Sequence, residues 1–242
     1  MGTEQVRAHT RPSPGSQAGR PLWVSIEGIN GVGKTTAAQA ASQALGERCL
    51  LLDELTDQGQ DTLPGRVIAA LSAEGDACLR TGHPVVETLA LMALKAREVE
   101  RFTDGYPLGL EAIIEDRGLD SVAVCQAAIM AAHYGQDDPQ RLAHYVLWTA
   151  RQWMGLPDLT ILLTGERTEC VRRLAARIGR RLTPSEQGVI YQTGDLYQAL
   201  AAQEPDRYTV VDTTGWPVHE TARAVEQTVR EHLTDRGCTH VA

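Results

Sequence analysis

The sequence has few aromatic residues and no long apolar run. Aromatic residues make up 5% of its 242 residues, and one of them is Phe. No apolar run approaches the roughly 18 residues that a membrane-spanning helix needs. The first 20 residues hold no hydrophobic segment of the kind found in a secretory signal. These absences predict no membrane partner, and they favour a disordered tail over residues 1–20.

Basic residues are also fewer than acidic residues. The chain holds 23 Lys and Arg residues against 31 Asp and Glu residues, which gives a formal net charge of −8. A general nucleic-acid-binding protein usually presents a basic surface, so this composition argues against a nucleic acid partner. An anionic ligand must therefore be captured by individual basic side chains and not by the overall field.

The cysteines lack the patterns of disulfides and of metal sites. Their number is odd, they are widely spaced, and no two form a C-x-x-C pair: Cys49, Cys78, Cys125, Cys170 and Cys238. This usage favours free thiols in a reducing compartment. It predicts a cytoplasmic location.

The remaining composition is that of an ordinary globular protein. Hydrophobic residues make up 43% and charged residues 22% of the chain, which is enough for a large core. A chain of this length forms one substantial domain. We expect this domain to span residues 21–234, between the tail at 1–20 and a C-terminal tail at 235–242.

A glycine-rich motif lies near the start of this domain. Residues 28–36 read G-I-N-G-V-G-K-T-T and fit the phosphate-binding pattern G-x-x-x-x-G-K-[ST]. They follow an apolar run at 22–27 that is typical of a buried strand. They precede residues 35–45, which are rich in Ala and Gln and favour a helix. Strand, loop and helix in this order predict a phosphate-binding loop.

Each part of this loop has an expected role. Glycines permit close backbone approaches that a Cβ would obstruct, so successive N–H groups can surround phosphate oxygens at the helix N-terminus. Lys34 can reach the β- and γ-phosphates of ATP, and the Thr35 hydroxyl can bind Mg²⁺. The predicted ATP-binding residues are Gly28, Asn30, Gly31, Val32, Gly33, Lys34, Thr35 and Thr36.

Short apolar runs alternate with helical patterns along the rest of the chain. This alternation indicates an α/β fold, in which a parallel sheet is covered by helices on both faces. Further strands are expected at 48–53, 111–116, 159–163 and 208–211. Further helices are expected at 64–80, 84–103, 119–134, 139–153, 168–178, 186–203 and 218–233.

Charged residues stand at the ends of two of these strands. Asp53 and Glu54 follow the second strand, and Asp116 and Arg117 follow the third. Ligands of parallel sheets bind at the carboxyl ends of the strands, so we expect these residues to face the phosphate loop. Asp116 could hold Mg²⁺ directly or through water, and the planar fork of Arg117 could grip an acceptor phosphate.

The segment 172–184 is rich in arginine. Five arginines lie within positions 172–181, and a glycine and a proline interrupt the helical pattern. We expect a mobile lid at about 177–187 that closes over ATP and neutralises charge on the transferred group. The candidate lid residues are Arg177, Arg180 and Arg181.

These motifs together resemble the thymidylate kinase family. Residues 25–36 look like that family's F-E-G-x-D-G-x-G-K-[ST]-T, and 116–121 with Gln126 are similar to its D-R-Y-x-x-S…Y-Q segment. Residues 157–163 match its P-D-L-T strand, and the resemblance covers 22–233. It implies a three-layer P-loop NTPase fold over residues 21–234, with a five-stranded parallel sheet, an arginine-bearing lid and a homodimeric partner.

The acceptor side departs from the family's pattern. Asn30 replaces a usual Asp, and Gly118 and Cys125 stand where tyrosines are usual. The aromatic residue that stacks on thymine, expected around 90–97, has no counterpart. The predicted substrate-binding residues are Asp53, Glu54, Lys95, Arg97, Arg117, Ser121 and Cys125. As isolated features, Lys95 and Arg97 fit a solvated helix face better than a contact with a substrate base.

The resemblance predicts an enzyme that uses ATP and Mg²⁺ to phosphorylate a nucleoside monophosphate, which need not be thymidylate. The predicted catalytic residues are Lys34, Glu54, Arg117, Arg180 and Arg181, with Thr35 and Asp116 as metal ligands. Two alternatives stay open. One is a nucleoside or other hydroxyl kinase with Glu54 as its base, and the other is a nucleotide-binding module without turnover.

Overall fold

The computed structural model describes residues 20–72, 76–78, 80–102, 105–135 and 138–239. The predicted N-terminal tail lies outside these residues except for Arg20, which forms an ion pair with Asp158. The last residues of the predicted C-terminal tail, 240–242, also lie outside. In the parts of the chain that the structure describes, no helix has the length and apolar character needed to cross a membrane.

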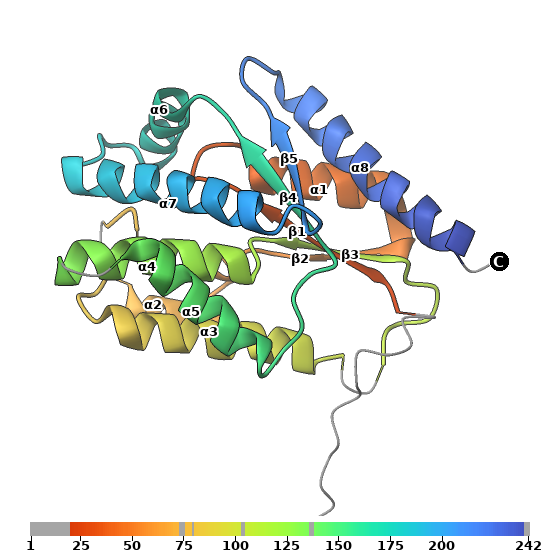
Figure 1. Ribbon diagram of the computed structural model, residues 1–242, viewed down its shortest axis with the longest axis horizontal. Coiled ribbons are helices and arrows are strands. Elements are labelled where there is room, and N and C mark those ends of the chain that lie inside the picture. Colours follow the sequence, from red (N-terminus) through yellow and green to blue (C-terminus); the bar gives the residue numbers. More distant parts are fainter. Residues whose placement is uncertain (1–19, 73–75, 79, 103–104, 136–137, 240–242) are drawn as a thin grey trace, which may run out of the picture.

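A five-stranded parallel sheet forms the middle of the molecule (Figure 1). Its strands are short and apolar. The strand before the phosphate loop, Leu22–Glu27, and its neighbour in the sheet, Ala112–Asp116, are buried along their whole length. The strand order is β2-β3-β1-β4-β5, and β1 pairs with β3 on one side and β4 on the other. The strands are β1 Leu22–Glu27, β2 Cys49–Leu52, β3 Ala112–Asp116, β4 Leu159–Thr164 and β5 Tyr208–Asp212.

Helices cover both faces of this sheet and complete the three layers (Figure 1). On one face α1 (Lys34–Leu45) packs against α8 (Val218–Thr239), and residues of α6 (Arg167–Ile178) join their core. On the other face lie α3 (Pro84–Glu100), α4 (Leu119–Tyr134), α5 (Pro139–Arg151) and α7 (Pro184–Gln203). The short α2 (Leu63–Leu71) and the turns η1 (Gly46–Arg48) and η2 (Leu55–Asp57) complete the described elements.

The helix predicted at 64–80 is shorter than expected. It ends at Leu71, and Ser72 takes an extended conformation. Beyond it the Asp76 carboxylate accepts hydrogen bonds from the Cys78 and Arg80 N–H groups. An aspartate that bonds nearby backbone in this way competes with the helical hydrogen-bond pattern.

The closing helix is longer than expected. α8 continues through 235–239, which the sequence predicts as tail. Arg236 forms an ion pair with Asp158 at 2.8 Å. This contact holds the end of the helix against the loop before β4.

The described cysteines form no disulfide with one another. The four cysteines whose side chains the structure describes, Cys49, Cys78, Cys125 and Cys170, are all free thiols.

Glu186 ties together three segments that are distant in sequence. It forms a capping box with Thr183 at the start of α7, and it also accepts hydrogen bonds from the Ala77 N–H and from the Arg180 guanidinium. The bond from Arg180 lowers the pKa of Glu186 below the ordinary value of 4.5. The carboxylate is therefore ionised at neutral pH in the folded protein.

Glu186→Gln is expected to lower the free energy of unfolding by about 1–3 kcal/mol at pH 7. The reason is that the Ala77 N–H and the Arg180 guanidinium would lose the charged carboxylate to which they donate. A carboxyl group whose folded pKa is lowered stabilises above its unfolded pKa, and this contribution fades as the pH falls below about 4.5. Urea unfolding at pH 7 and pH 4 should show the gap between variant and wild type narrowing at pH 4. An equal gap at both values would contradict this assignment.

Candidate active site

The phosphate loop joins β1 to α1, and two of its glycines are fixed by their surroundings. Gly28 has φ 140°, and a Cβ there would lie 2.4 Å from the Leu163 carbonyl oxygen. Gly31 has φ 86°, and a Cβ there would lie 2.1 Å from the Cys170 carbonyl oxygen. A side chain cannot be placed at either position without moving the backbone of β4 or α6.

Lys34 begins α1 with its ammonium group buried against the loop. It is 4% exposed, and its Nζ donates to the Ile29 carbonyl oxygen at 2.8 Å. Burial and the nearby charge of Arg117 lower the pKa of Lys34 to about 7. A bound anion would favour the protonated form, so this site is suited to a negatively charged ligand.

Asp116 ends β3 with a carboxylate oxygen that has no hydrogen-bond partner. Its Oδ1 is buried and unbonded among the described residues. Burial raises the pKa of Asp116, and a hydrogen bond with the Thr35 side chain opposes that rise. Buried polar atoms without partners are rare, and carboxylate and hydroxyl oxygens are the ligands that Mg²⁺ prefers. The residues present therefore fit the predicted metal.

Arg117 follows Asp116 in a strained conformation. Its φ is 66°, in the left-handed region that few residues with a side chain adopt. The guanidinium donates to the Asn30 side chain in the phosphate loop, and its Nε lies 2.9 Å from Glu54 Oε1. That Nε–H nevertheless lacks hydrogen-bond geometry to a described partner. Arg117 is thus held between the loop and Glu54.

The charge of Arg117 also acts on Glu54. Burial alone would raise the pKa of Glu54, but the charges of Arg117 and Lys34 lower it below the ordinary value. Glu54 is therefore an ionised carboxylate at neutral pH. Its ion pair with Arg117 joins the end of β2 to the end of β3, as the strand-end argument predicts.

A cavity of about 550 Å³ opens beside these groups. Its wall includes three residues of the phosphate loop, Gly28, Ile29 and Asn30, together with Glu54 and Arg117. Such a volume is typical of a site for a small molecule. The lining residues that the structure describes include no aromatic side chain, so a planar base would contact aliphatic and polar groups.

Of the remaining predicted substrate residues, the structure brings two to this cavity in a usable position. Ser121 and Cys125 line it from α4. Asp53 and Arg97 are exposed and lie outside the cavity wall. Asp53 and Glu54 adjoin in sequence, but the backbone directs one of them to solvent and the other to Arg117.

Lys95 lies in the cavity wall, but its ammonium group is already paired with two carboxylates. It is 3% exposed, and its ammonium lies 2.9 Å from Glu98 and 2.8 Å from Glu115. The two carboxylates raise the pKa of Lys95 despite its burial. An ammonium shared by two buried carboxylates is a structural group of the core and not a free donor for a base.

The three candidate lid arginines lie in different surroundings. Arg177 lines the cavity, and its charge acts on Glu54. Arg180 is bonded to Glu186, and Arg181 is exposed. Neither Arg180 nor Arg181 is among the lining residues, so their predicted catalytic role would require the segment between α6 and α7 to move.

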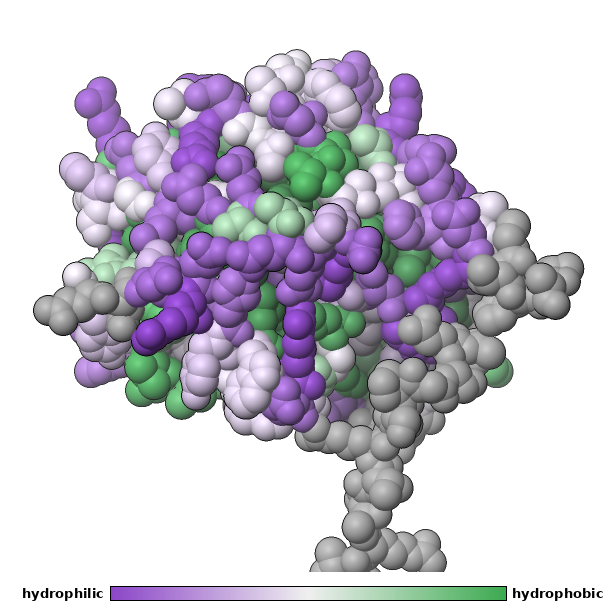
Figure 2. Space-filling view, viewed as in Figure 1, coloured by the Kyte–Doolittle hydropathy of each residue, from purple (hydrophilic) through white to green (hydrophobic). Residues whose placement is uncertain are grey.

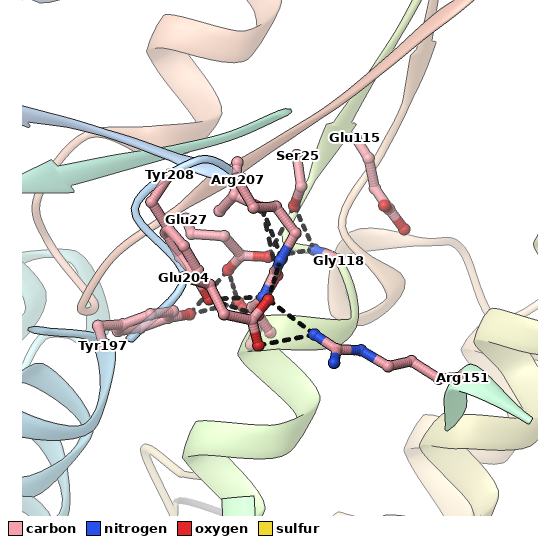
Figure 3. Close-up of polar contacts among 12 residues, drawn as sticks. Ser25, Glu27, Glu115, Gly118, Arg151, Tyr197, Glu204, Arg207 and Tyr208 are labelled. Carbon is pink, nitrogen blue, oxygen red and sulfur yellow. Dashed lines mark hydrogen bonds and ion pairs between the residues drawn. The ribbon is translucent and has the colours of Figure 1, made fainter. Parts of the chain in front are cut away.

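A buried hydrogen-bond network lies beneath the cavity, and its central residue was not predicted as functional. Glu27, the last residue of β1, is fully buried and is bonded to Ser25, Gly118, Ser121 and Tyr197 (Figure 3). The sequence does carry one signal of it, because Glu27 is a charged residue that ends an apolar strand directly before the glycine loop.

Gly118 is the point where this network meets Arg117. A Cβ at Gly118 would lie 2.6 Å from Ser25 Oγ and 2.8 Å from Glu115 Oε2. The absence of a side chain noted from the sequence is therefore a packing requirement in this protein.

Comparison with known proteins agrees with this geometry. The family model for thymidylate kinase matches residues 26–225. The probable thymidylate kinase of Halorubrum lacusprofundi is 28% identical over 212 residues, which are 88% of this chain and 99% of that protein. The thymidylate kinase of Leifsonia xyli is 32% identical over 212 residues, 84% of this chain and 92% of that protein.

Solved structures share the fold. The thymidylate kinase of Candida albicans superimposes with a TM-score of 0.63 at 19% identity, covering 88% of this chain and 92% of that one. The thymidylate kinase of Ehrlichia chaffeensis gives a TM-score of 0.59 at 18% identity, covering 87% and 98%. With the family model matching most of its length, the chain belongs to the thymidylate kinase family, a family of nucleotide kinases.

Proposed function

We propose that this protein transfers the γ-phosphoryl group of ATP to the phosphate of a nucleoside monophosphate. The observation that carries the proposal is the position of the cavity, whose wall is shared with the phosphate loop through Gly28, Ile29 and Asn30. A donor bound by the loop and an acceptor bound in the cavity would therefore meet at Arg117 and Lys34.

Residues of this protein would align the donor and acceptor phosphates and neutralise their negative charge. An acceptor phosphate is mostly dianionic at neutral pH, since its second pKa is about 6, and it therefore needs no general base. Lys34 neutralises charge on the donor, and Arg117, which lies in the cavity wall, would bind the acceptor phosphate through its guanidinium. Mg²⁺, when held by Thr35 and Asp116, would neutralise charge on the β- and γ-phosphates.

The nucleoside end of ATP has a separate place to bind. A second hollow is lined by Thr36 and Ala40 of α1 and by Val218, His219 and Arg223 of α8. Thr36 follows the metal-binding position of the loop, so a triphosphate on the loop would lead into this hollow. The location supports ATP binding with its base directed away from the acceptor cavity.

The acceptor is not assigned to thymidylate. The cavity lacks an aromatic residue among its described lining, and Lys95 is engaged by Glu98 and Glu115. In place of an aromatic ring, Leu91 and Cys125 provide aliphatic and thiol surface in the cavity wall. We therefore propose a monophosphate acceptor whose base is held by shape and by hydrogen bonds.

The alternative hydroxyl kinase depends on Glu54. This residue lines the cavity and is ionised at neutral pH, as a general base must be. Its ion pair with Arg117, however, lowers its proton affinity and so weakens it as a base. The same pair favours phosphorylation of a monophosphate, because it holds Arg117 in the wall of the acceptor cavity.

One assay separates these functions. Purified protein is incubated with ATP and Mg²⁺ and with panels of nucleosides and nucleoside monophosphates, and ADP release is followed. We expect turnover with one or more monophosphates. Turnover confined to nucleosides would overturn the proposal in favour of the hydroxyl kinase, and nucleotide binding without turnover would favour the binding module.

The variant Glu54→Gln further distinguishes a hydroxyl kinase from a monophosphate kinase. In a hydroxyl kinase, loss of the base should reduce kcat by about 10²–10⁴-fold. In a monophosphate kinase we expect a loss of less than about tenfold, because no proton must be accepted. Asp53→Asn is the matched control, since Asp53 is the exposed neighbour outside the cavity.

The homodimer implied by the resemblance is also a proposal. The start of α3 exposes Val85, Val86 and Leu89, which are 48%, 54% and 55% exposed. Figure 2 shows hydrophobic side chains at the lower left, where α3 begins in Figure 1. A second copy could cover this surface, and light scattering that gives the mass of one chain would contradict it. The cytoplasmic location stays a prediction from composition.

A further inference from the structure

Glu27 is a buried carboxylate without a cationic partner among its bonded neighbours. It is 0% exposed, and burial raises its pKa above the ordinary value. Its Oε1 accepts from the Ser25 hydroxyl at 2.7 Å and from the Gly118 N–H at 2.8 Å. Its Oε2 accepts from the hydroxyls of Ser121 and Tyr197. A carboxyl group so placed costs stability unless all of its lone pairs are used, and here each oxygen receives two donors.

Three of these four donors lie outside β1, on separate parts of the active site. Gly118 is the residue after Arg117, Ser121 lies in the first turn of α4 and lines the acceptor cavity, and Tyr197 lies on α7. None of the four hydrogen bonds goes to the phosphate loop. Glu27 therefore joins the end of β1 to the acceptor side of the site.

The bond to Gly118 bears directly on Arg117. Arg117 keeps a left-handed backbone with φ 66°, which persists only where the surroundings hold it. On one side its own N–H donates to the Ile26 carbonyl oxygen at 3.2 Å. On the other side the Gly118 N–H donates both to Glu27 and, at 3.1 Å, to Ser25 Oγ. The turn is thus fixed from the strand that precedes the phosphate loop.

We propose that Glu27 is a positioning residue for the acceptor half of the reaction: its carboxylate holds the Gly118 N–H and thereby keeps Arg117 in the left-handed conformation that places its guanidinium at the phosphate loop. The kinetic consequence of this inference rests on the proposed function, and its structural consequence rests on the hydrogen bonds to Gly118. Glutamic acid places two acceptor oxygens here, whereas glutamine places one oxygen and one NH₂ group that cannot accept. Replacing Glu27 by glutamine therefore takes the acceptor away from part of these donors, and we expect the turn to loosen.

Glu27→Gln tests this with little change in shape. With the monophosphate that turns over fastest in the acceptor panel, we expect its KM to rise about tenfold, equal to about 1.4 kcal/mol, while the Kd for ATP changes less than twofold. Tyr208→Phe is the matched control. It removes a buried hydroxyl bonded to Asp120 in the adjacent network of Arg207, which does not reach Gly118, and the acceptor KM should stay within twofold.

A second readout does not depend on turnover. The sequence contains two Arg–Gly pairs, 117–118 and 236–237, so labelling Arg at the carbonyl carbon and Gly at nitrogen leaves two amide cross-peaks. Glu27→Gln should shift the Gly118 cross-peak upfield and leave that of Gly237 in place. If wild type turns over no acceptor, the proposed function fails while this measurement still tests the contact.

Two outcomes would overturn the inference. One is an unshifted Gly118 cross-peak, and the other is a variant in which ATP and acceptor weaken equally or not at all. If Glu27→Gln fails to fold, Ser25→Ala removes the second acceptor of the Gly118 N–H and leaves the carboxylate in place. Because Glu27 still holds the Gly118 N–H, the acceptor KM should stay within about twofold. A rise of about tenfold would assign the holding contact to Ser25 and contradict the proposal.

Discussion

Lys34→Ala is expected to reduce kcat by about 10²–10³-fold or more with every acceptor, the usual loss when one preorganised donor to a developing charge is removed. The physical reason is the position of the ammonium. It is 4% exposed and bonded to the carbonyl oxygen of Ile29 in the loop itself, so no other described cation can take its place without rearranging the loop. Steady-state ADP release with saturating ATP and acceptor measures the effect.

Arg141→Ala is the control for this experiment, because it removes one positive charge from an exposed position on α5. It should retain wild-type turnover. A Lys34→Ala protein that keeps full activity would remove the assignment of the loop as the donor site. The same melting curve for both variants would show that the loss is chemical and not a loss of folding.

Arg117→Ala is expected to raise the acceptor KM by about 10²-fold, because charge-assisted hydrogen bonds to a phosphate contribute about 1.5–3 kcal/mol. The Kd for ATP should change far less, since the guanidinium faces Asn30 and Glu54 and not the backbone N–H groups of the loop. Titration with ATP by calorimetry and initial rates over a range of acceptor concentrations separate the two quantities.

Arg97→Ala provides the comparison for Arg117. Arg97 is exposed on α3 and lies outside the cavity wall, so its loss should leave both constants within twofold. A fall in ATP affinity as large as the rise in acceptor KM would instead assign Arg117 to the donor.

The parts of the site that follow from local pattern were predictable. The spacing of glycines, Lys34 and Thr35 fixes the loop once a strand precedes it and a helix follows it. The alternation of apolar runs and helices fixes the parallel sheet, and the sheet brings Glu54 and Arg117 together because the carboxyl ends of neighbouring strands meet at one edge.

The parts that depend on contacts between distant segments were not predictable. Helical periodicity places Lys95 on a face of α3, but it does not reveal that Glu115 of β3 lies 2.8 Å away. It also gives no indication that Asp76 will bond the Cys78 N–H and end the helical pattern early. Glu27 illustrates the same limit, since its partners are 91, 94 and 170 residues away along the chain.

The tight packing around Gly118 has a consequence for redesign. A protein engineer who wishes to graft an aromatic side chain onto this turn, to narrow the choice of sugar, cannot do so by a single substitution. The Cβ alone would meet Ser25 Oγ at 2.6 Å and Glu115 Oε2 at 2.8 Å, and both of these residues are buried and hydrogen-bonded. Both side chains would have to move to admit such a variant, and Glu115 in turn pairs with Lys95. A side chain added at Gly118 would therefore also disturb the ion pair between Glu115 and Lys95.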